Sequence, residues 1–432
     1  MTKMKNLRWW VVGLVALAAI INYIDRQALG VLWPLSMGEA VYPEKSDTEL
    51  KEIYGFVSVV FLFAYAFGQA LFGKIFDWIG TRLGFVLSIG VWSIATALHA
   101  LTQGILTFSI FRALLGVSEA GNWPGAAKAN AEWFPTKERA LAQGIFNSGA
   151  AIGGVISIPL ISYLAVFMGW KAIFVVVGLT GLLWLVPWLI IVKSPPESHP
   201  WITEEEREYI LTGKKRESTD QDVNAYEPTT GQMLSHKQSW GVIIATAAID
   251  PIWWIFVVWI PTYLIDVHNM NALELAKNGW IPYFGAMFGA WFGGLLAQNR
   301  LKAGWDITKT RKLIITLGCM IMLPALLALQ APGGPFSAVM IMAIILFGFQ
   351  TAIGNVQTLP SDYLGEKTVG SLAGIAGMAA KLTAGLFIYT VPWLTDDGSY
   401  GIVFVIGASL ALIAMASIWL LCPKIEPLKP KA

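Results

Sequence analysis

Long apolar runs, each about as long as one membrane crossing, follow one another along most of this chain, with short polar segments between them. A hydrocarbon core about 30 Å thick requires roughly 20 apolar residues per helix. Windows of that length predict an all-α integral membrane protein with twelve transmembrane helices. The first six helices are expected near residues 8–32, 54–73, 83–103, 105–127, 140–164 and 170–193. The second six are expected near residues 240–264, 279–298, 312–330, 335–358, 369–392 and 398–421.

One long polar stretch separates the two sets of helices. We therefore expect a six-helix bundle over 1–193, a cytoplasmic linker over 194–239, a second bundle over 240–422 and a cytoplasmic tail over 423–432. The charged run from Thr203 to Glu208 predicts a short surface helix in the linker. Thr203 would cap this helix with Glu206 as its reciprocal partner, and the run would form a solvated face.

Composition excludes the soluble classes. Of the 432 residues 56% are hydrophobic and 13% are charged, whereas about 25% of a soluble domain is charged. A net charge of +2 gives no reason to expect a nucleic-acid partner. The two cysteines lie in apolar runs, so no disulfide framework is expected.

The distribution of basic residues predicts the topology. Most of the 30 Lys and Arg residues lie in loops on one side of the predicted helices, which is the cytoplasmic side by the positive-inside rule. Both termini are therefore expected in the cytoplasm of a multi-pass protein of the bacterial inner membrane. No cleavable signal peptide is expected, because the first apolar run is long enough to span and has no small-residue cleavage site.

A few ionisable residues lie inside the predicted helices. A charge at the bilayer centre costs from about 3 to more than 10 kcal/mol, so these groups should face a polar interior. They are Asp25, Arg26, Arg112, Glu119, Lys128, Asp250 and Lys381.

In the fourth predicted helix Arg112 and Glu119 lie seven positions apart, so two turns return them to nearly the same face. Gly116 and Trp123 continue that face, and Trp123 is a candidate for stacking on a sugar-like carbon skeleton. We interpret Arg112 as part of an anion site and Glu119 as a protonatable coupling group. The alternative is that each pairs with another helix and only stabilises the bundle.

In the first predicted helix Asp25 and Arg26 are adjacent, about 100° apart around the axis. One should point into a central cavity and the other toward a neighbouring helix. The planar guanidinium of Arg26 suits a substrate carboxylate, and Asp25 would be a second protonation site. A structural ion pair near the helix end is the alternative.

Other polar residues are weaker candidates for the site. Tyr65, Asn147 and Ser148 are suited to ligand hydroxyl groups, with Tyr65 alternatively an interfacial tyrosine. Most glycines of 144–154 are expected to serve helix packing. An offset of 230 residues places Gly374 on Gly144, and glycine-rich segments that correspond in two halves indicate a transporter site. In the second half, Lys381 is a candidate second anchor for the substrate or a lysine that snorkels to the interface. Gln350 and Asn355 would line the cavity or form interhelical hydrogen bonds. Trp253 and Trp254 are candidates for stacking on the substrate, and the role of Asp250 is open.

The buried charges favour an anionic substrate. Four basic and three acidic groups leave one net positive charge, and protonation of Asp25 or Glu119 would strengthen anion binding, which is a scheme for proton symport. The four histidines form no ligand cluster and no nucleophile–base pair is apparent, so neither an enzyme nor a metal or other cofactor is expected.

Two segments resemble the major facilitator superfamily, specifically its anion:cation symporter branch. Asn22-Tyr23-Ile24-Asp25-Arg26 resembles the Tyr-x-Asp-Arg signature of helix 1, and residues 73–82 resemble the superfamily's loop motif. The resemblance implies cytoplasmic gating by Asp77 and Arg82, with Lys128 as a further gating candidate. Trp78 stands where the motif usually has Arg.

Nearly the whole chain resembles bacterial hexuronate transporters. The motifs are Glu132-Trp133-Phe134-Pro135-Thr136-Lys137-Glu138-Arg139, Phe146-Asn147-Ser148-Gly149 and Trp259-Ile260-Pro261. The resemblance implies import of galacturonate or glucuronate with protons. From the related galactonate transporters it implies Asp25 and Glu119 as proton-linked carboxylates and Arg26 at the substrate carboxylate. Ala150 and Lys381 depart from the related patterns, which implies different substrate contacts.

Several alternatives stay open. The substrate would be another organic anion such as an aldonate, glucarate or sialate, or the protein would exchange organophosphate for phosphate. In a further alternative, Na⁺ is the coupled ion in place of H⁺. A membrane sensor that binds sugar acids without transport is the alternative of a different class. A monomer in the lipid bilayer is expected in each case.

Overall fold

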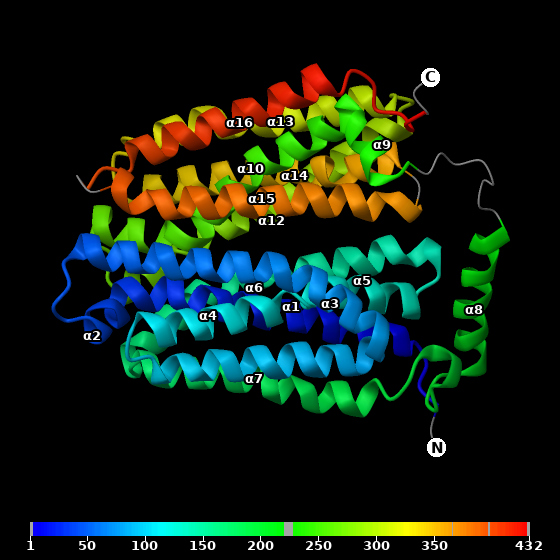
Figure 1. Cartoon of the computed structure of the whole chain (residues 1–432), viewed down its shortest axis with the longest axis horizontal. Helices are drawn as coiled ribbons and strands as arrows, with labels where there is room; N and C mark the ends of the chain where they lie inside the picture. The colour runs from blue at the N-terminus through cyan, green and yellow to red at the C-terminus, as the bar shows by residue number, and fades with distance from the viewer. Residues whose placement is uncertain (1–2, 220–227, 365, 396–397, 430–432) are drawn as a thin grey trace. The chain divides into compact units, whose positions relative to one another are not determined.

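Helices make up almost the whole of the computed structural model, which describes residues 3–219, 228–364, 366–395 and 398–429. Within these residues ten helical stretches are long and apolar enough to cross a membrane. Two compact units are present (Figure 1). Unit 1 comprises Met1–Glu44 and Val60–Val223, and unit 2 comprises Lys45–Val59 and Asn224–Ala432. The prediction of an all-α chain with helices long enough to span a membrane is confirmed.

Unit 1 contains the first group of helices. The elements are α1 (Leu7–Leu32), a π-helical turn (Trp33–Met37), α2 (Gly38–Val41), α3 (Asp47–Leu98), a 3₁₀ turn (His99–Leu101), α4 (Ile105–Glu119), α5 (Asn122–Trp133), α6 (Thr136–Phe167), α7 (Trp170–Ile191), a second 3₁₀ turn (Pro196–Ser198) and α8 (Glu204–Thr219). The start of α3 belongs to unit 2. α1 packs against α6 and α7.

Two predicted spans lie in α3, which changes direction at Gly80. The apolar stretches are Asp47–Phe76 and Trp78–Leu101. Gly80 has φ of 76°, a left-handed conformation that glycine adopts without the steric cost of a Cβ. The sharp turn after the first stretch therefore depends on the glycine of the loop motif.

The span predicted over 105–127 is interrupted, because α4 ends at Glu119 and α5 begins at Asn122. Pro124 has no N–H and cannot bond to the carbonyl group of Ala120, four residues earlier. The N–H of Gly121 turns back to the carbonyl of Ser118 at 3.2 Å, and the Ser88 hydroxyl donates to the same carbonyl at 2.7 Å. The break therefore follows directly after the buried Glu119.

Close approach of α1 and α6 depends on two glycines of α6. A Cβ on Gly149 would overlap the backbone carbonyl of Ala16, and one on Gly153 would lie 2.8 Å from Cβ of Tyr23. A Cβ on Gly144 would meet nothing within 4 Å. The packing interpretation holds for Gly149 and Gly153 but not for Gly144.

We expect Gly149→Ala to destabilise the protein by about 1–3 kcal/mol, because the added methyl group must push α1 away from α6. Thermal unfolding in detergent measures the effect. Gly144→Ala is the matched control and should melt at the same temperature or slightly higher. Equal melting temperatures for both variants and the parent protein would show that the close contact of Gly149 with α1 does not determine the stability of the protein.

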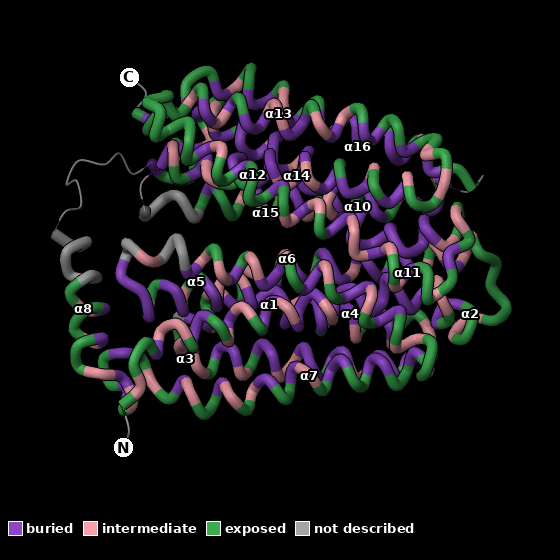
Figure 2. Tube along the Cα trace, turned by 180° about the vertical axis from the view of Figure 1, so that it is seen from behind, coloured by how far each residue is buried: buried purple, intermediate pink, exposed green. Residues whose placement is uncertain are grey.

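Unit 2 contains the remaining helices. They are α9 (Thr230–Ser235), α10 (Lys237–His268), α11 (Ala272–Asn278), α12 (Ile281–Lys302), α13 (Ile307–Ala328), α14 (Pro335–Tyr363), α15 (Glu366–Leu394) and α16 (Gly401–Leu421). α10 packs against α14, α15 and α16, and 78% of its apolar window is buried. Figure 2 shows this helix as a largely buried tube. α10 is therefore a core helix of unit 2.

The first turns of α3 belong to unit 2 through polar contacts. Lys51 Nζ lies 2.8 Å from Asp266 Oδ2, and the Tyr54 hydroxyl donates to the Val258 carbonyl at 2.5 Å. Trp393 Nε1 of α15 donates to Glu52 at 3.0 Å. Through these contacts the segment Lys45–Val59 packs with α10 and α15 as part of unit 2.

The linker helix α8 is attached to the start of α1. The Glu206 carboxylate accepts hydrogen bonds from the backbone N–H groups of Leu7 at 3.0 Å and Arg8 at 3.2 Å, and from the Arg8 guanidinium at 2.8 Å. A carboxylate at a helix N-terminus satisfies N–H groups that have no partner inside the helix. Glu206 therefore caps α1.

Two expectations for the linker are corrected by these contacts. Thr203 caps α8 as predicted, since its hydroxyl accepts from the Glu206 N–H at 3.3 Å, but the Glu206 side chain bonds to α1 and is not the reciprocal partner. The charged run is not wholly a solvated face, because Glu206 is only 6% exposed.

We expect Glu206→Ala to detach α8 from α1 and to accelerate limited proteolysis of the linker several-fold, because the N–H groups of α1 lose their acceptor. Digestion followed by mass spectrometry locates the cut. Glu205→Ala, which changes an exposed neighbour, should behave like the parent protein. Unchanged cleavage in Glu206→Ala would contradict the capping role.

Candidate functional site

The centre of unit 1 contains an ion pair between α1 and α4. Arg26 donates to Glu119 Oε2 from Nη2 at 3.1 Å and from Nε at 3.4 Å. Arg26 also donates to Asn22 Oδ1, one turn earlier, at 3.1 Å. Glu119 is fully buried and Arg26 is 7% exposed. A buried pair of this kind persists only because each charge compensates the other.

Aromatic rings surround the cation. The Arg26 guanidinium lies 5.1 Å from the ring centre of Tyr23, 5.7 Å from Phe61 and 5.2 Å from Tyr65. Arg112 lies 4.6 Å from the ring centre of the same Phe61. Arginine tolerates such surroundings because it is weakly hydrated and interacts with aromatic faces. Tyr65 therefore lies at the ion pair, and the two guanidinium groups share the ring of Phe61.

Asp25 belongs to the same cluster. It is 1% exposed and interacts electrostatically with Glu119, Arg112 and Arg26. Arg26 therefore binds the Glu119 carboxylate, whereas Asp25 is repelled by this carboxylate and attracted by the two arginines. The structure brings together four of the predicted residues, two acids and two bases.

Two further members of this cluster were missed from the sequence. Asn22 accepts from Arg26, and its position one turn before the arginine was an available signal. His99 is fully buried, donates or accepts at Nδ1 with the Ala95 carbonyl at 2.7 Å and interacts electrostatically with Arg112. No local pattern marked His99, because its neighbours come from other helices.

The remaining candidates of unit 1 lie on α5 and α6. Trp123 packs edge-on against Phe146 with ring centres 5.0 Å apart. Asn147 is exposed and accepts from Gln143 at 3.1 Å, so its amide is accessible to a ligand. The Ser148 hydroxyl donates within its own helix to the Gly144 carbonyl at 2.9 Å. Lys128 is half-buried on α5.

The two residues of the loop motif are only partly described. The side chain of Asp77 lies outside the described residues. The backbone carbonyl of Arg82 accepts from Trp188 Nε1 of α7 at 3.0 Å. The neighbouring Thr81 hydroxyl donates to the Glu132 carboxylate at the end of α5.

Unit 2 contains a second buried ion pair, between α10 and α15. Lys381 Nζ lies 2.6 Å from Asp250 Oδ2, and Trp254 Nε1 donates to the same oxygen at 3.0 Å. The Lys381 ammonium also lies 5.3 Å from the ring centre of Trp254. Lys381 therefore reaches an acid on the neighbouring helix and not an end of its own helix.

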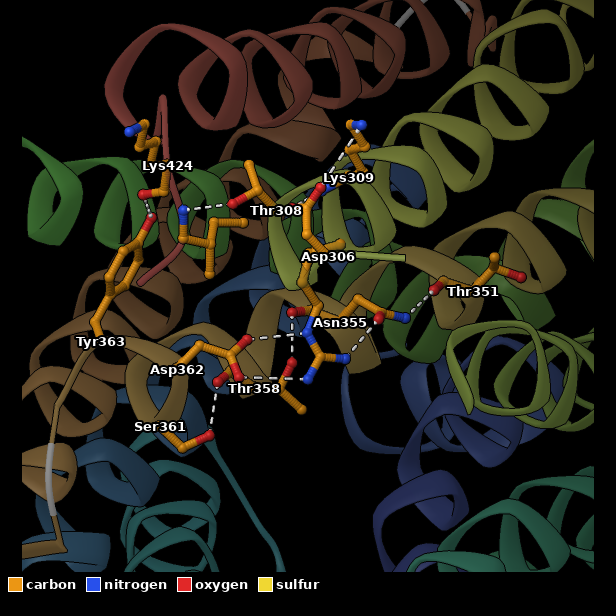
Figure 3. A network of polar contacts seen from close by, with 12 residues as sticks. Asp306, Thr308, Lys309, Thr351, Asn355, Thr358, Ser361, Asp362, Tyr363 and Lys424 are labelled. Carbon is orange, nitrogen blue, oxygen red and sulfur yellow. Dashed lines mark hydrogen bonds and ion pairs between the residues drawn. The ribbon is translucent and has the colours of Figure 1, made fainter. Parts of the chain in front are cut away.

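Asn355 takes part in a polar network of unit 2 (Figure 3). Its side-chain oxygen accepts from Arg311 Nη1 at 3.0 Å, and its amide donates to the Thr351 carbonyl at 3.4 Å. Arg311 also donates from Nε to Asp362 at 2.9 Å. The geometry agrees with the interhelical alternative for Asn355, whereas Gln350 is half-buried on the same helix.

Arg311 and Asp362 were not recognised as a pair from the sequence. They stand about 230 residues after Arg82 and Glu132, the offset that relates the two halves. The correspondence was available as a signal. It was missed because only the glycine-rich segments were compared.

Comparison with known proteins places the chain in a family. The family model of the Major Facilitator Superfamily matches residues 15–388. The hexuronate transporter of Escherichia coli (strain K12) is 31% identical over 421 residues, 97% of this chain and 95% of its own length. The probable galactarate/D-glucarate transporter GudP of Bacillus subtilis (strain 168) is 32% identical over 428 residues, 95% of this chain and 91% of its own length.

Solved structures show the same fold. An inward-facing bacterial homologue of the human lysosomal transporter Spinster has a TM-score of 0.69 at 17% identity and covers 97% of this chain and 96% of its own. A D-xylose–proton symporter has a TM-score of 0.69 at 14% identity and covers 95% of this chain and 98% of its own. Taken with the family match and the apolar helices, these likenesses show that the chain belongs to the Major Facilitator Superfamily and is a multi-pass membrane transporter, not an enzyme.

Proposed function

We propose that this protein imports a sugar acid, a hexuronate such as galacturonate or glucuronate, by proton symport with alternating access. The observation that carries the proposal is the buried Arg26–Glu119 pair with Asp25 and Arg112 beside it. The protein would lie in the bacterial inner membrane as a monomer. It would have twelve transmembrane helices in two bundles joined by a cytoplasmic linker, with both termini in the cytoplasm.

The substrate carboxylate and the Glu119 carboxylate would compete for the guanidinium of Arg26. The carboxylate of the sugar acid takes the place of Glu119 on the guanidinium of Arg26, whose planar fork matches a carboxylate. Glu119 then lies buried without its cation, which favours its protonated form. Binding of the anion and binding of a proton therefore reinforce each other, and release of the anion restores the ion pair.

A second acid allows a second proton. Asp25 interacts with the same two arginines, so an added anion changes its surroundings too. A monoanion carried with two protons moves one net positive charge inward, which contributes about 2.3 kcal/mol at a membrane potential of 100 mV. Import against a gradient follows from this stoichiometry.

The relatives support a sugar acid as substrate. Besides the hexuronate transporter, a galacturonate transporter of Dickeya chrysanthemi is 31% identical over 75% of this chain and 91% of its own length. The two arginines in the aromatic cluster suit an anionic group, and Asn147 and Tyr65 suit sugar hydroxyls. The gating proposal for Asp77 and Arg82 rests on the loop motif, and Lys128 of α5 is a further gating candidate.

Uptake into proteoliposomes tests the proposal. With separate pH, sodium and voltage gradients, we expect galacturonate or glucuronate to accumulate under an inward proton gradient and an interior-negative potential. Accumulation driven by a sodium gradient would show that Na⁺, and not H⁺, is the coupled ion. Exchange of organophosphate without proton dependence would favour the exchanger, and binding in a thermal-shift assay without uptake would favour the sensor.

A further inference from the structure

A chain of three side-chain amides runs from α5 to the exposed surface of α6 in unit 1. Asn130 of α5 donates from Nδ2 to Gln143 Oε1 of α6 at 2.8 Å. Gln143 donates from Nε2 to Asn147 Oδ1, one turn later on the same helix, at 3.1 Å. Asn130 is 5% exposed, Gln143 is half-buried and Asn147 is exposed. The chain of amides therefore begins in the protein interior and ends at a surface.

The order of donors and acceptors in this chain orients the last amide. A side-chain amide has one acceptor oxygen and an NH₂ group with two donors. The oxygens of Gln143 and Asn147 both accept a hydrogen bond from the preceding amide, so the NH₂ group of Asn147 is the outward end. Among the described residues, none accepts a hydrogen bond from this group. Asn147 therefore presents hydrogen-bond donors at the surface of α6.

The exposed amide lies away from the lipid-facing side of α6. Asn147 belongs to the membrane-spanning stretch Ala142–Phe167. Ile152, Ile156 and Leu160 form an exposed apolar row along this stretch, which suits contact with lipid. At about 100° per residue, this row begins about 140° around the axis from Asn147. A polar side chain inside a span is expected to face the bundle interior or a water-filled cavity, so Asn147 faces the polar interior.

Helix register relates this amide to the Arg26 cluster. α1 and α6 run parallel, as their two glycine contacts show, and Gly153 of α6 lies against Ile20 of α1. In this register Asn147 lies about two turns, or about 11 Å along the axis, from the level of Asn22. The Arg26 guanidinium bonds to Asn22. A six-carbon sugar acid with its carboxylate at Arg26 is therefore long enough to bring a hydroxyl group to Asn147.

We propose that Gln143, held by Asn130, positions the amide of Asn147 to donate a hydrogen bond to one hydroxyl oxygen of the bound sugar acid. This inference rests on the proposed function and names the residues that distinguish one sugar acid from another. Arg26 recognises the carboxylate, which all hexuronates share. A donor of fixed direction recognises the position of a hydroxyl group, which differs among them. Gln143 and Asn130 are positioning residues, because they act through Asn147.

Competition between galacturonate uptake and a series of monodeoxy hexuronates tests the contact in proteoliposomes. In the parent protein, the analogue that lacks the hydroxyl group at Asn147 should inhibit about three- to tenfold more weakly than galacturonate, because one hydrogen bond is lost. Asn147→Ala should bind galacturonate more weakly by the same factor and should not discriminate between the two compounds. Ile152→Ala, a control on the lipid-facing row of α6, should discriminate as the parent protein does.

Gln143→Glu tests the positioning role, because a carboxylate accepts hydrogen bonds and donates none. It can accept from both Asn130 and Asn147, so the Asn147 amide should turn its NH₂ group inward and its oxygen toward the substrate. Gln143→Glu should therefore lose the discrimination as Asn147→Ala does, although Asn147 is still present. The added charge repels all hexuronates alike, so the ratio of the inhibition constants is the measured quantity.

Asn130→Asp reverses the same chain from its buried end and keeps the test decisive if Gln143→Glu does not fold. Discrimination that persists in Asn147→Ala would overturn the contact, and discrimination that persists in Gln143→Glu or Asn130→Asp would overturn the positioning role. Equal inhibition of the parent protein by every analogue would overturn the inference and leave the proposed function intact. Absence of hexuronate uptake by the parent protein would contradict the proposed function itself, and the inference with it.

Discussion

Arg26→Ala is expected to abolish binding and uptake of the sugar acid. The guanidinium is the cation that pairs with Glu119, and its loss removes the bidentate partner of the substrate carboxylate. Loss of a charged hydrogen-bond partner costs about 1.5–3 kcal/mol, so affinity should fall at least about tenfold. Ligand-induced thermal stabilisation measures binding, and proteoliposome uptake measures transport.

Two matched variants separate binding from folding in this prediction. Arg26→Lys keeps the charge but loses the planar fork, so it should bind more weakly than the parent protein yet remain detectable. Arg26→Ala/Glu119→Gln removes both buried charges and should melt at a higher temperature than Arg26→Ala alone, because no acid is left unpaired. Ordinary uptake by Arg26→Ala would remove Arg26 from the substrate site.

Glu119→Gln is expected to retain substrate exchange and to lose proton-driven accumulation. Glutamine keeps the shape of the side chain and can still accept a hydrogen bond from Arg26, but it does not titrate. Arg26 is then freed from its ionic partner, so the anion binds without a proton. Counterflow under equal pH on both sides should continue, while an inward proton gradient should no longer concentrate the substrate.

Asp25→Asn gives the comparison for that result. If Asp25 takes up the second proton, its variant should keep some proton-driven accumulation but lose the dependence on membrane potential, because a monoanion with one proton moves no net charge. Loss of both exchange and accumulation in Glu119→Gln would instead assign Glu119 to structure. Unchanged accumulation would place the proton elsewhere.

The two units have similar helix packing. α1 packs against α6 in unit 1, as α10 packs against α15 in unit 2. Each unit also has a buried acid–base pair on a core helix, Arg26 with Glu119 and Asp250 with Lys381. The two ion pairs do not occupy corresponding positions. The cation lies on α1 in unit 1, whereas in unit 2 it lies on α15 and the acid lies on α10.

Local sequence was sufficient to predict most of the spanning helices and the costly charges. Apolar length determines where a helix can span, and an ionisable group inside such a run indicates function wherever the fold places it. The positions of Arg26, Glu119, Asp250 and Lys381 were therefore recognisable from the sequence alone. Gly80 lies within the segment 73–82 that resembles the loop motif, but its left-handed conformation became visible only in the structure.

Only the tertiary structure decided which side chains meet. Arg26 and Glu119 are 93 residues apart and Lys381 and Asp250 are 131 apart, so their pairing depends on which helices become neighbours. The same reason explains the errors. Glu206 caps a helix 199 residues earlier in the chain, and the Arg311–Asp362 pair that also binds Asn355 joins two helices. The hydrophobic pattern of the sequence shows how long a helix can be and which of its residues are costly to bury. The partner that compensates a buried charge depends on which helices pack together.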